Sequence, residues 1–252
     1  MKEKKDKTLN LILPIVTVLA ILVFWAIASA IIGNGYVLPS LKQTATEFFS
    51  LLKSSEFYLA FFMTLLRSII AFVLSFVFAF ILSVFALKCM VVNSIADTVT
   101  SIMRALPTIA VVLLLLFWTN SFVSSIIVTV LVVLPTVYTG LKSAFSSQDK
   151  TVAEAGRVDG ADEKQVFLLV QLPQALPSVY RIVGSGISLN FKLMVAAEVI
   201  AQTARSIGYL LNTAKVYFEV ARMFALVCAT VIIGVIIEFI FNKISDKVGE
   251  WR

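Results

Sequence analysis

Long runs of hydrophobic residues dominate the chain, and the two-residue alternation typical of barrel strands is absent. Six runs are each long enough, or nearly so, to cross a bilayer as a helix, which takes about 20 residues. They cover residues 9–33, 57–87, 95–118, 122–145, 177–201 and 220–241. Because backbone groups in lipid must be satisfied within the segment, such runs predict helices. The pattern therefore predicts an all-α, polytopic membrane protein with about six transmembrane helices.

Several positions punctuate this pattern. A Gly33-Asn34-Gly35 turn ends the first run, and apolar residues then recur at helical spacing over residues 41–52. This predicts a short amphipathic helix, lying either on the outer membrane surface or on the outer face of the protein itself. Pro107 and Pro135 fall inside the third and fourth runs, where proline usually kinks a helix. The first run is too long for the core of a cleaved signal peptide and is expected to act as a signal anchor.

Composition supports the membrane assignment. Hydrophobic residues make up 60% of the chain and charged residues 14%, whereas soluble domains have about 45–50% and about 25%. With the N-terminus inside, 13 basic residues face the cytoplasm and 5 face outward. The cytoplasmic set is Lys2, Lys4, Lys5, Lys7, Lys88, Lys142, Lys150, Arg157, Lys164, Arg181, Lys243, Lys247 and Arg252. The outward set is Lys42, Lys53, Arg205, Lys215 and Arg222. This bias predicts that both termini and residues 146–176 are cytoplasmic.

The net charge of +6 is thus interpreted as a topology signal. Its charges are dispersed and accompany no binding motif, so we expect no nucleic-acid partner. The chain has no His, and Cys89 and Cys228 lie in different hydrophobic segments, where small apolar packing is the expected role. No Gly is followed by Lys, which excludes a phosphate-binding P-loop. We therefore expect no catalytic, metal or cofactor site, and any ATP must be bound by a partner.

One polar segment interrupts the apolar chain, between the fourth and fifth runs. Thr151 and Glu154 have the spacing of a capping box, and Gly160 stands where a left-handed helix stop is expected. A second helix is predicted from 161 to 169. Pro173 and Pro177 then bracket the return to the membrane, and Pro177 suits the first turn of the fifth span.

The same segment carries a recognisable signature. Residues 154–173 place Glu154, Ala155, Gly160, Val170, Leu172 and Pro173 at the spacing E-A-A-x3-G-x9-I-x-L-P. Gly156 replaces the second Ala, and Val170 replaces Ile. This pattern resembles the "EAA loop" of the membrane subunits of ATP-binding-cassette (ABC) importers, which have the type I permease fold.

The resemblance implies a permease subunit that is not itself an enzyme. Its partners would be two cytoplasmic ATPases that bind ATP-Mg, a second permease copy forming a homodimer, an extracytoplasmic solute-binding protein and the bilayer of the bacterial cytoplasmic membrane. The loop would dock as a short coupling helix into an ATPase groove. The residues expected to carry this coupling are Glu154, Ala155, Gly156, Asp159, Gly160, Ala161, Leu172 and Pro173.

A narrower resemblance involves the C-terminal half. Ala197-Glu198, Gly208-Tyr-Leu-Leu211, Gly234 and the final Trp251-Arg252 resemble the permease class for nitrate, taurine and alkanesulfonates. This implies a small anionic or organic solute. The expected organisation is a tail (1–8), a first span with an outer amphipathic helix (9–54), and a permease core (55–252) that contains the coupling loop 146–176.

Ionisable and polar residues in the fifth run are candidates for the translocation pathway, because such groups are costly in lipid. Helical spacing places Asn190, Met194 and Glu198 on one stripe and Lys192 on the opposite side. Glu198 is expected near the outer mouth, with a gate or a structural role. Lys192 is expected either to line the pore or to pair within the bundle. Arg67 is expected to snorkel near the outer interface.

Three alternatives remain at this point. An ion- or proton-coupled secondary transporter would need carboxylates near the midplane, and often internal repeats, which are not apparent here. A channel would need a filter-like loop, which is not apparent either. The polar segment could also be a simple connector between two spans.

Overall fold

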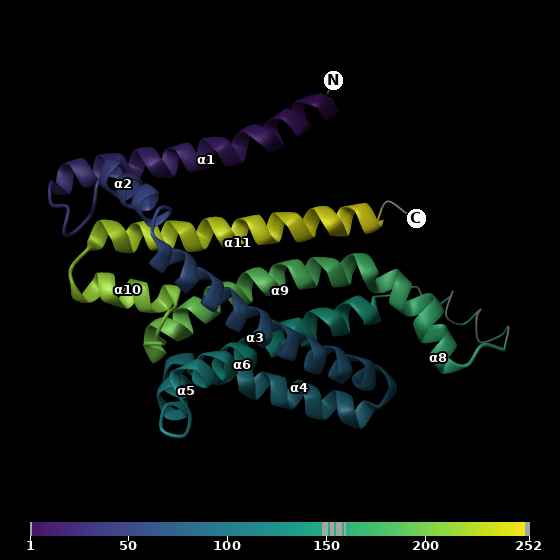
Figure 1. The fold of residues 1–252 in the computed structure, drawn as a ribbon. Coiled ribbons are helices and arrows are strands. Elements are labelled where there is room, and N and C mark those ends of the chain that lie inside the picture. Colours follow the sequence, from purple (N-terminus) through teal and green to yellow (C-terminus); the bar gives the residue numbers. More distant parts are fainter. Residues whose placement is uncertain (1, 148–150, 152–153, 155–157, 159, 250–252) are drawn as a thin grey trace. The chain divides into compact units, whose positions relative to one another are not determined.

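The computed structural model describes residues 2–147, 151, 154, 158 and 160–249. In this part of the chain the regular elements are helices, without a strand (Figure 1). They are α1 (Lys2–Ile32), α2 (Leu41–Leu51), α3 (Ser55–Lys88), α4 (Met90–Ala105), α5 (Thr108–Leu115), α6 (Ser121–Ser146), α8 (Glu163–Val166), a π-helical turn (Phe167–Gln171), α9 (Leu172–Ala201), α10 (Ile207–Val216) and α11 (Val220–Gly249). The predicted all-α class is confirmed.

The predicted number of six membrane spans is not confirmed by the part of the chain that the structure describes. Four helices are long and apolar enough to cross a bilayer, namely Ser55–Lys88, Ser121–Ser146, Lys164–Ala201 and Val220–Lys247. The pair α4 and α5 is a fifth candidate, but its two helices are bent by 88°. In α1, the described residues Val16–Ile32 form a shorter apolar helix. Among the described residues, the predicted six spans are therefore matched by four, or by five if the bent pair counts as one.

The third hydrophobic run is not one helix because of Pro107. Steric contact with a proline ring disfavours the helical region for the preceding residue. Leu106 accordingly has φ −67° and ψ 128°, and Pro107 is also extended, with ψ 108°. The kink expected at this proline is thus a complete break between α4 and α5.

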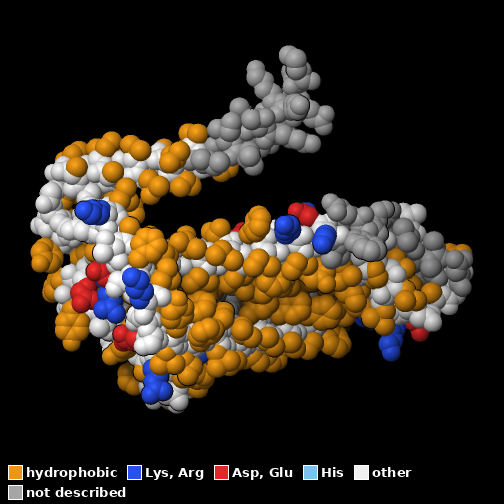
Figure 2. All heavy atoms as spheres, turned by 45° about the horizontal axis from the view of Figure 1, so that its top comes forward, with side chains coloured by type: hydrophobic (Ala, Val, Ile, Leu, Met, Phe, Trp, Pro, Cys, Tyr) orange, Lys and Arg blue, Asp and Glu red, His pale blue; other side chains and the backbone are white. Residues whose placement is uncertain are grey.

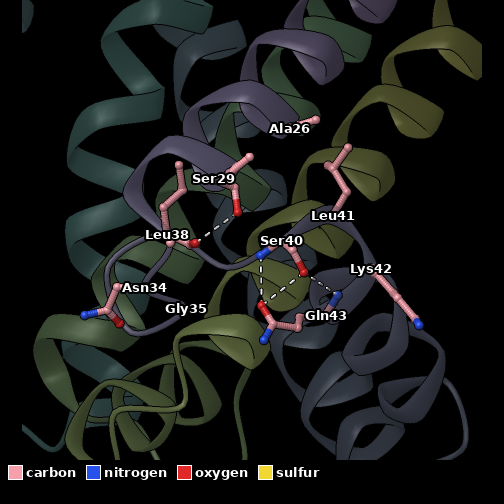
Figure 3. Close-up of a pocket in the computed structure, with 11 residues that line it drawn as sticks. Ala26, Ser29, Asn34, Gly35, Leu38, Ser40, Leu41, Lys42 and Gln43 are labelled. Carbon is pink, nitrogen blue, oxygen red and sulfur yellow. Dashed lines mark hydrogen bonds between the residues drawn. The ribbon is translucent and has the colours of Figure 1, made fainter.

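Other helix ends also differ from the runs. Helical backbone begins at Lys2, so the predicted tail 1–8 continues into α1. At the other end, α11 extends past 241 to Gly249. The helix after the first run is present as α2, where Ser40 and Gln43 form a capping box: Ser40 Oγ accepts from Gln43 N at 3.2 Å and Gln43 Oε1 accepts from Ser40 N at 2.9 Å (Figure 3).

The described chain divides into two compact units. The first comprises residues 1–58 and 210–229. Within it, Gly33 ends α1 with φ +63°, and Ser29 Oγ then donates to Leu38 O at 3.3 Å across the turn that follows (Figure 3). The indole of Trp25 donates to Pro39 O at 3.0 Å and packs against Phe224, with ring centroids 5.3 Å apart. These contacts fix the turn between α1 and α2.

The second unit comprises residues 59–209 and 230–252. Its core joins the middle of α3, α6 and α9, and includes the fully buried Val133, Tyr138 and Leu141. The outer sides of the long helices remain apolar: Phe62, for example, is 61% exposed. Hydrophobic side chains dominate the face shown in Figure 2, as expected for helices that face lipid.

Candidate functional site

The predicted coupling loop is only partly described. Ala155, Gly156 and Asp159 lie outside the described residues, and so do the residues between Thr151 and Glu154, so the capping box there stays a prediction. Glu154 itself is helical and exposed. Gly160 has φ +87°, which confirms the expected left-handed conformation, and a Cβ built on it would meet no atom within 4 Å.

Directly after Gly160 a new helix begins. Asp162 Oδ1 accepts from Gln165 N at 2.6 Å, and Gln165 Oε1 accepts from Asp162 N at 2.9 Å. This reciprocal pair satisfies two backbone donors at the start of α8. The predicted helix start at Ala161 is therefore close to the observed one at Glu163, with the partly buried Ala161 just outside it.

This helix does not end before the membrane span. It continues through the π-helical turn into α9, so Lys164–Ala201 is a single span candidate of 38 residues. Pro177 was expected in the first turn of the span but lies inside α9, whereas Pro173 occupies its first turn. The expectation for Pro177 was wrong because the helix reaches back to the loop.

The π-helical turn has a physical cause in Pro173. A proline inside a helix lacks the N–H that would bond to the residue four positions back, and its ring crowds that carbonyl. Leu172 N bonds instead to Phe167 O, five residues back, which widens the turn just before the proline. Leu172 and Pro173, the last two motif residues, thus lie at this irregular turn.

At the far end of α9, Glu198 is completely buried in an ionic cluster. Arg67 Nη1 on α3 donates to its Oε1 at 2.5 Å, and Thr64 Oγ1 donates to its Oε2 at 2.8 Å. Arg67 is 2% exposed and Glu198 is 0% exposed. Arg67 was expected to snorkel to an interface, and this was wrong, because Glu198 provides a buried counter-ion at the same depth.

The cluster also fixes the connection between α9 and α10. Arg67 Nη2 donates to the carbonyl oxygens of Ala204 at 3.3 Å and Arg205 at 3.1 Å. Thr64 Oγ1 accepts from Ile207 N at 3.0 Å. Gly208 packs so closely on Glu198 that an added Cβ would overlap the Glu198 side chain. One ion pair thus holds α3, the end of α9 and the start of α10 together.

The other predicted pathway residues fall into two groups. Asn190 and Met194 are 0% exposed, like Glu198, and therefore face the interior of the chain. Asn190 Nδ2 donates to Ser68 O at 2.7 Å on α3, while its Oδ1 has no partner among the described residues. Lys192 alone among the four candidates is exposed.

Lys192 lies along a groove of about 450 Å³. The groove is bounded by α6, α9 and α11 and is lined by Thr136, Val137, Gly140, Ile182, Ser185, Gly186, Ser188, Leu189, Lys192 and Glu238. The Lys192 stem passes Gly234 on α11, where an added Cβ would come within 2.9 Å of Lys192 Cε. Glu238 was missed as a groove residue because α11 was expected to end near 241.

Residues 86–250 match the family model described as "Binding-protein-dependent transport system inner membrane component". A protein of Brucella abortus (strain 2308), described as a probable ABC transporter permease, is 26% identical over 132 residues, which is 52% of this chain and 48% of that protein. The chain thus spans about half the length of this relative.

Two further relatives have named solutes. The taurine transport system permease protein TauC of Escherichia coli (strain K12) is 25% identical over 162 residues, or 64% of this chain and 58% of that protein. The riboflavin transport system permease protein RibX of Chloroflexus aurantiacus is 25% identical over 239 residues, or 94% and 89%. Among solved structures, the inward-facing MetNI methionine ABC transporter matches with a TM-score of 0.65 and 19% identity, over 76% of this chain and 96% of the other.

Proposed function

The chain belongs to the family of binding-protein-dependent transport system inner membrane components, and from this premise we propose how it works. It is the non-catalytic permease subunit of an ABC importer. We propose that it forms, with a second copy of itself, the path for a small anionic or organic solute. An extracytoplasmic binding protein delivers the solute, and two cytoplasmic ATPases that bind ATP-Mg drive its passage.

Coupling to the ATPases is assigned to residues 151–162. Val158 in this segment is 86% exposed. Two residues further on, a Cβ built on Gly160 would meet no atom within 4 Å. An exposed apolar side chain close to an uncovered glycine suits docking into a groove of another protein.

The observation that carries the proposal is the continuous helix that follows. Lys164–Ala201 extends over 38 residues, or roughly 57 Å at 1.5 Å per residue. One end adjoins the loop, and the other end is held by Arg67 and Glu198. A displacement of the loop by ATP-driven closure of the ATPases is therefore transmitted along one element to the opposite side of the bilayer.

Roles within the pathway follow from burial. Lys192 is exposed and can face a solute. Asn190, Met194 and Glu198 are fully buried within one chain, so we assign them the role of positioning α9 against α3 and α6.

The test compares two glycines that share one conformation. Gly160 and Gly33 both have positive φ, and a Cβ at either position meets nothing within 4 Å. Valine is strained by about 1–3 kcal/mol at such a position. Gly160→Val is expected to abolish solute uptake and reduce copurification of the ATPase, while membrane abundance is retained. Gly33→Val carries the same strain away from the loop and should retain both activities.

Glu154→Ala should act like Gly160→Val but more weakly, because a lost helix cap costs about 0.5–2 kcal/mol. Gly160→Asn separates strain from contact, since Asn tolerates the left-handed region but adds a side chain. Uptake that falls equally in Gly160→Val and Gly33→Val would indicate general strain. Normal uptake and ATPase binding in Gly160→Val would make the loop a mere connector and refute the coupling role.

A further inference from the structure

Two opposite charges line the groove between α6, α9 and α11. Lys192 and Glu238 both border this cavity of about 450 Å³, but their charged groups do not approach within the 4.0 Å of an ion pair. Among the described residues, the side chains of Lys192 and Glu238 form no hydrogen bond or ion pair with any other residue. The groove thus presents one free cation and one free anion.

Both charges lie within span candidates, Lys192 in Lys164–Ala201 and Glu238 in Val220–Lys247. Lys192 is exposed and Glu238 is partly buried. An unpaired charge within a span is costly in lipid, so each needs water or a ligand of opposite charge.

The groove also carries hydroxyl groups. Ser188 Oγ donates to Gly234 O at 3.1 Å, and Ser185 Oγ donates to Arg181 O at 3.0 Å. Thr136 Oγ1 donates to Val132 O at 3.3 Å. Ser188 is 1% exposed, whereas Ser185 and Thr136 are exposed. The two exposed hydroxyls have used their one proton on a backbone carbonyl and keep acceptor lone pairs for a ligand N–H or for water.

We propose that this groove selects a small zwitterionic solute. Lys192 attracts the carboxylate or sulfonate of the solute, and Glu238 together with the hydroxyl oxygens attracts its ammonium group. The proposal rests on the proposed function and narrows its solute class to molecules that carry both charges. Lys192 and Glu238 are then specificity residues of the pathway.

The test measures the electrostatics of the groove with charged thiol reagents. The complete importer in proteoliposomes carries Cys89→Ser, Cys228→Ala and the reporter Ser185→Cys, which is isosteric, exposed and borders the groove. The probes are anionic 2-sulfonatoethyl and cationic 2-trimethylammonioethyl methanethiosulfonate. Both are expected to label the reporter, since both charges are complemented within the groove.

Lys192→Gln should slow the anionic reagent by about two- to fifteenfold, the effect of one charge at roughly 10 Å for dielectric constants between 80 and 20. It should leave the cationic reagent as fast or faster. Glu238→Gln should slow the cationic reagent in the same way. Taurine, as a zwitterionic competitor, should protect the reporter better than 2-hydroxyethanesulfonate or ethanolamine, which each carry one of its charges.

Several results would overturn the proposal. As a control, a cysteine replaces the exposed Lys42. If this control cysteine reacts while the reporter stays unlabelled, the groove is covered. If only Lys192→Gln changes the labelling rates, the groove is an anion site. If the three competitors protect the reporter equally, the groove is not a binding site for a zwitterion. Loss of the dimer in Lys192→Gln, seen by size-exclusion chromatography, would show that the charges pair between copies. None of these results affects the Gly160 test, so the coupling role stands or falls separately.

Discussion

Breaking the buried ion pair between Arg67 and Glu198 should destabilise the chain strongly. Glu198→Leu leaves the guanidinium of Arg67 at 2% exposure without its carboxylate. The Nε of Arg67 already lacks a partner among the described residues, so the remaining bonds are only those to the carbonyls of Ala204 and Arg205. The mutation therefore places an uncompensated charge in the protein interior.

The magnitude follows from measurements on buried pairs. Removing one partner costs about 3–5 kcal/mol, whereas replacing both by apolar residues of similar volume is often neutral or stabilising. Glu198→Leu and Arg67→Met should each cost this amount, and the double variant should cost at least about 2 kcal/mol less than their sum. With about 2–4 °C per kcal/mol for a chain of this size, each single variant should lose roughly 6–20 °C in melting temperature.

The assay is heating of the detergent-solubilised, fluorescently tagged protein, followed by size-exclusion chromatography of the surviving fraction. Lys42→Met is the control, because it removes an exposed cation outside the span candidates and should change stability by about 0.5 kcal/mol or less. A double variant as unstable as the sum of the singles would show that the two side chains do not interact. So would a Glu198→Leu variant that melts with the control.

Two further predictions follow from the structure. Gly208→Ala should lower the melting temperature, because the added Cβ would overlap Glu198. Gly35→Ala should have a mild effect, since its Cβ meets only the flexible Gln43 side chain. Equal effects of the two variants on the melting temperature would contradict the close packing at Gly208. Single cysteines are introduced into a variant that lacks Cys89 and Cys228, and intact cells are treated with an impermeant thiol reagent. A cysteine in place of Lys42 should react, whereas cysteines in place of Lys164 and Lys247 should not. Labelling at 164 from outside would refute the topology.

The sequence was sufficient to predict the helical class and the backbone conformation of Gly160. Hydrophobic runs alone located α3, α6 and α11, since each is long and apolar enough to cross a bilayer. Gly160 was placed in the left-handed region from a local rule, and the structure confirms it at φ +87°. These features depend on residues that are near one another in the chain.

Features that depend on distant residues were predicted less well. Arg67 and Glu198 are 131 residues apart, and each had a plausible role on its own, so their pairing became apparent only in the folded chain. The signal that could have found it is a pair of opposite charges at the same depth in two spans. Similarly, Pro177 was placed at a helix start because Pro173 and Pro177 were interpreted as a break between the helix at 161–169 and the fifth span.

The position of these features on a single helix constrains how the importer can work. The far end of α9 is held to α3 through Glu198, and its middle packs against α6 through Met194 and neighbours. The weakest part of this helix is the π-helical turn before Pro173 together with Pro177, where regular backbone bonds are missing. A push from the loop should therefore be taken up partly by bending at 167–177 and otherwise be transmitted along α9, while the ion pair stays intact. The groove lined by Ser185, Ser188 and Lys192 lies beyond this bend on the same helix, so bending at 167–177 changes how α9 is oriented where it borders the groove.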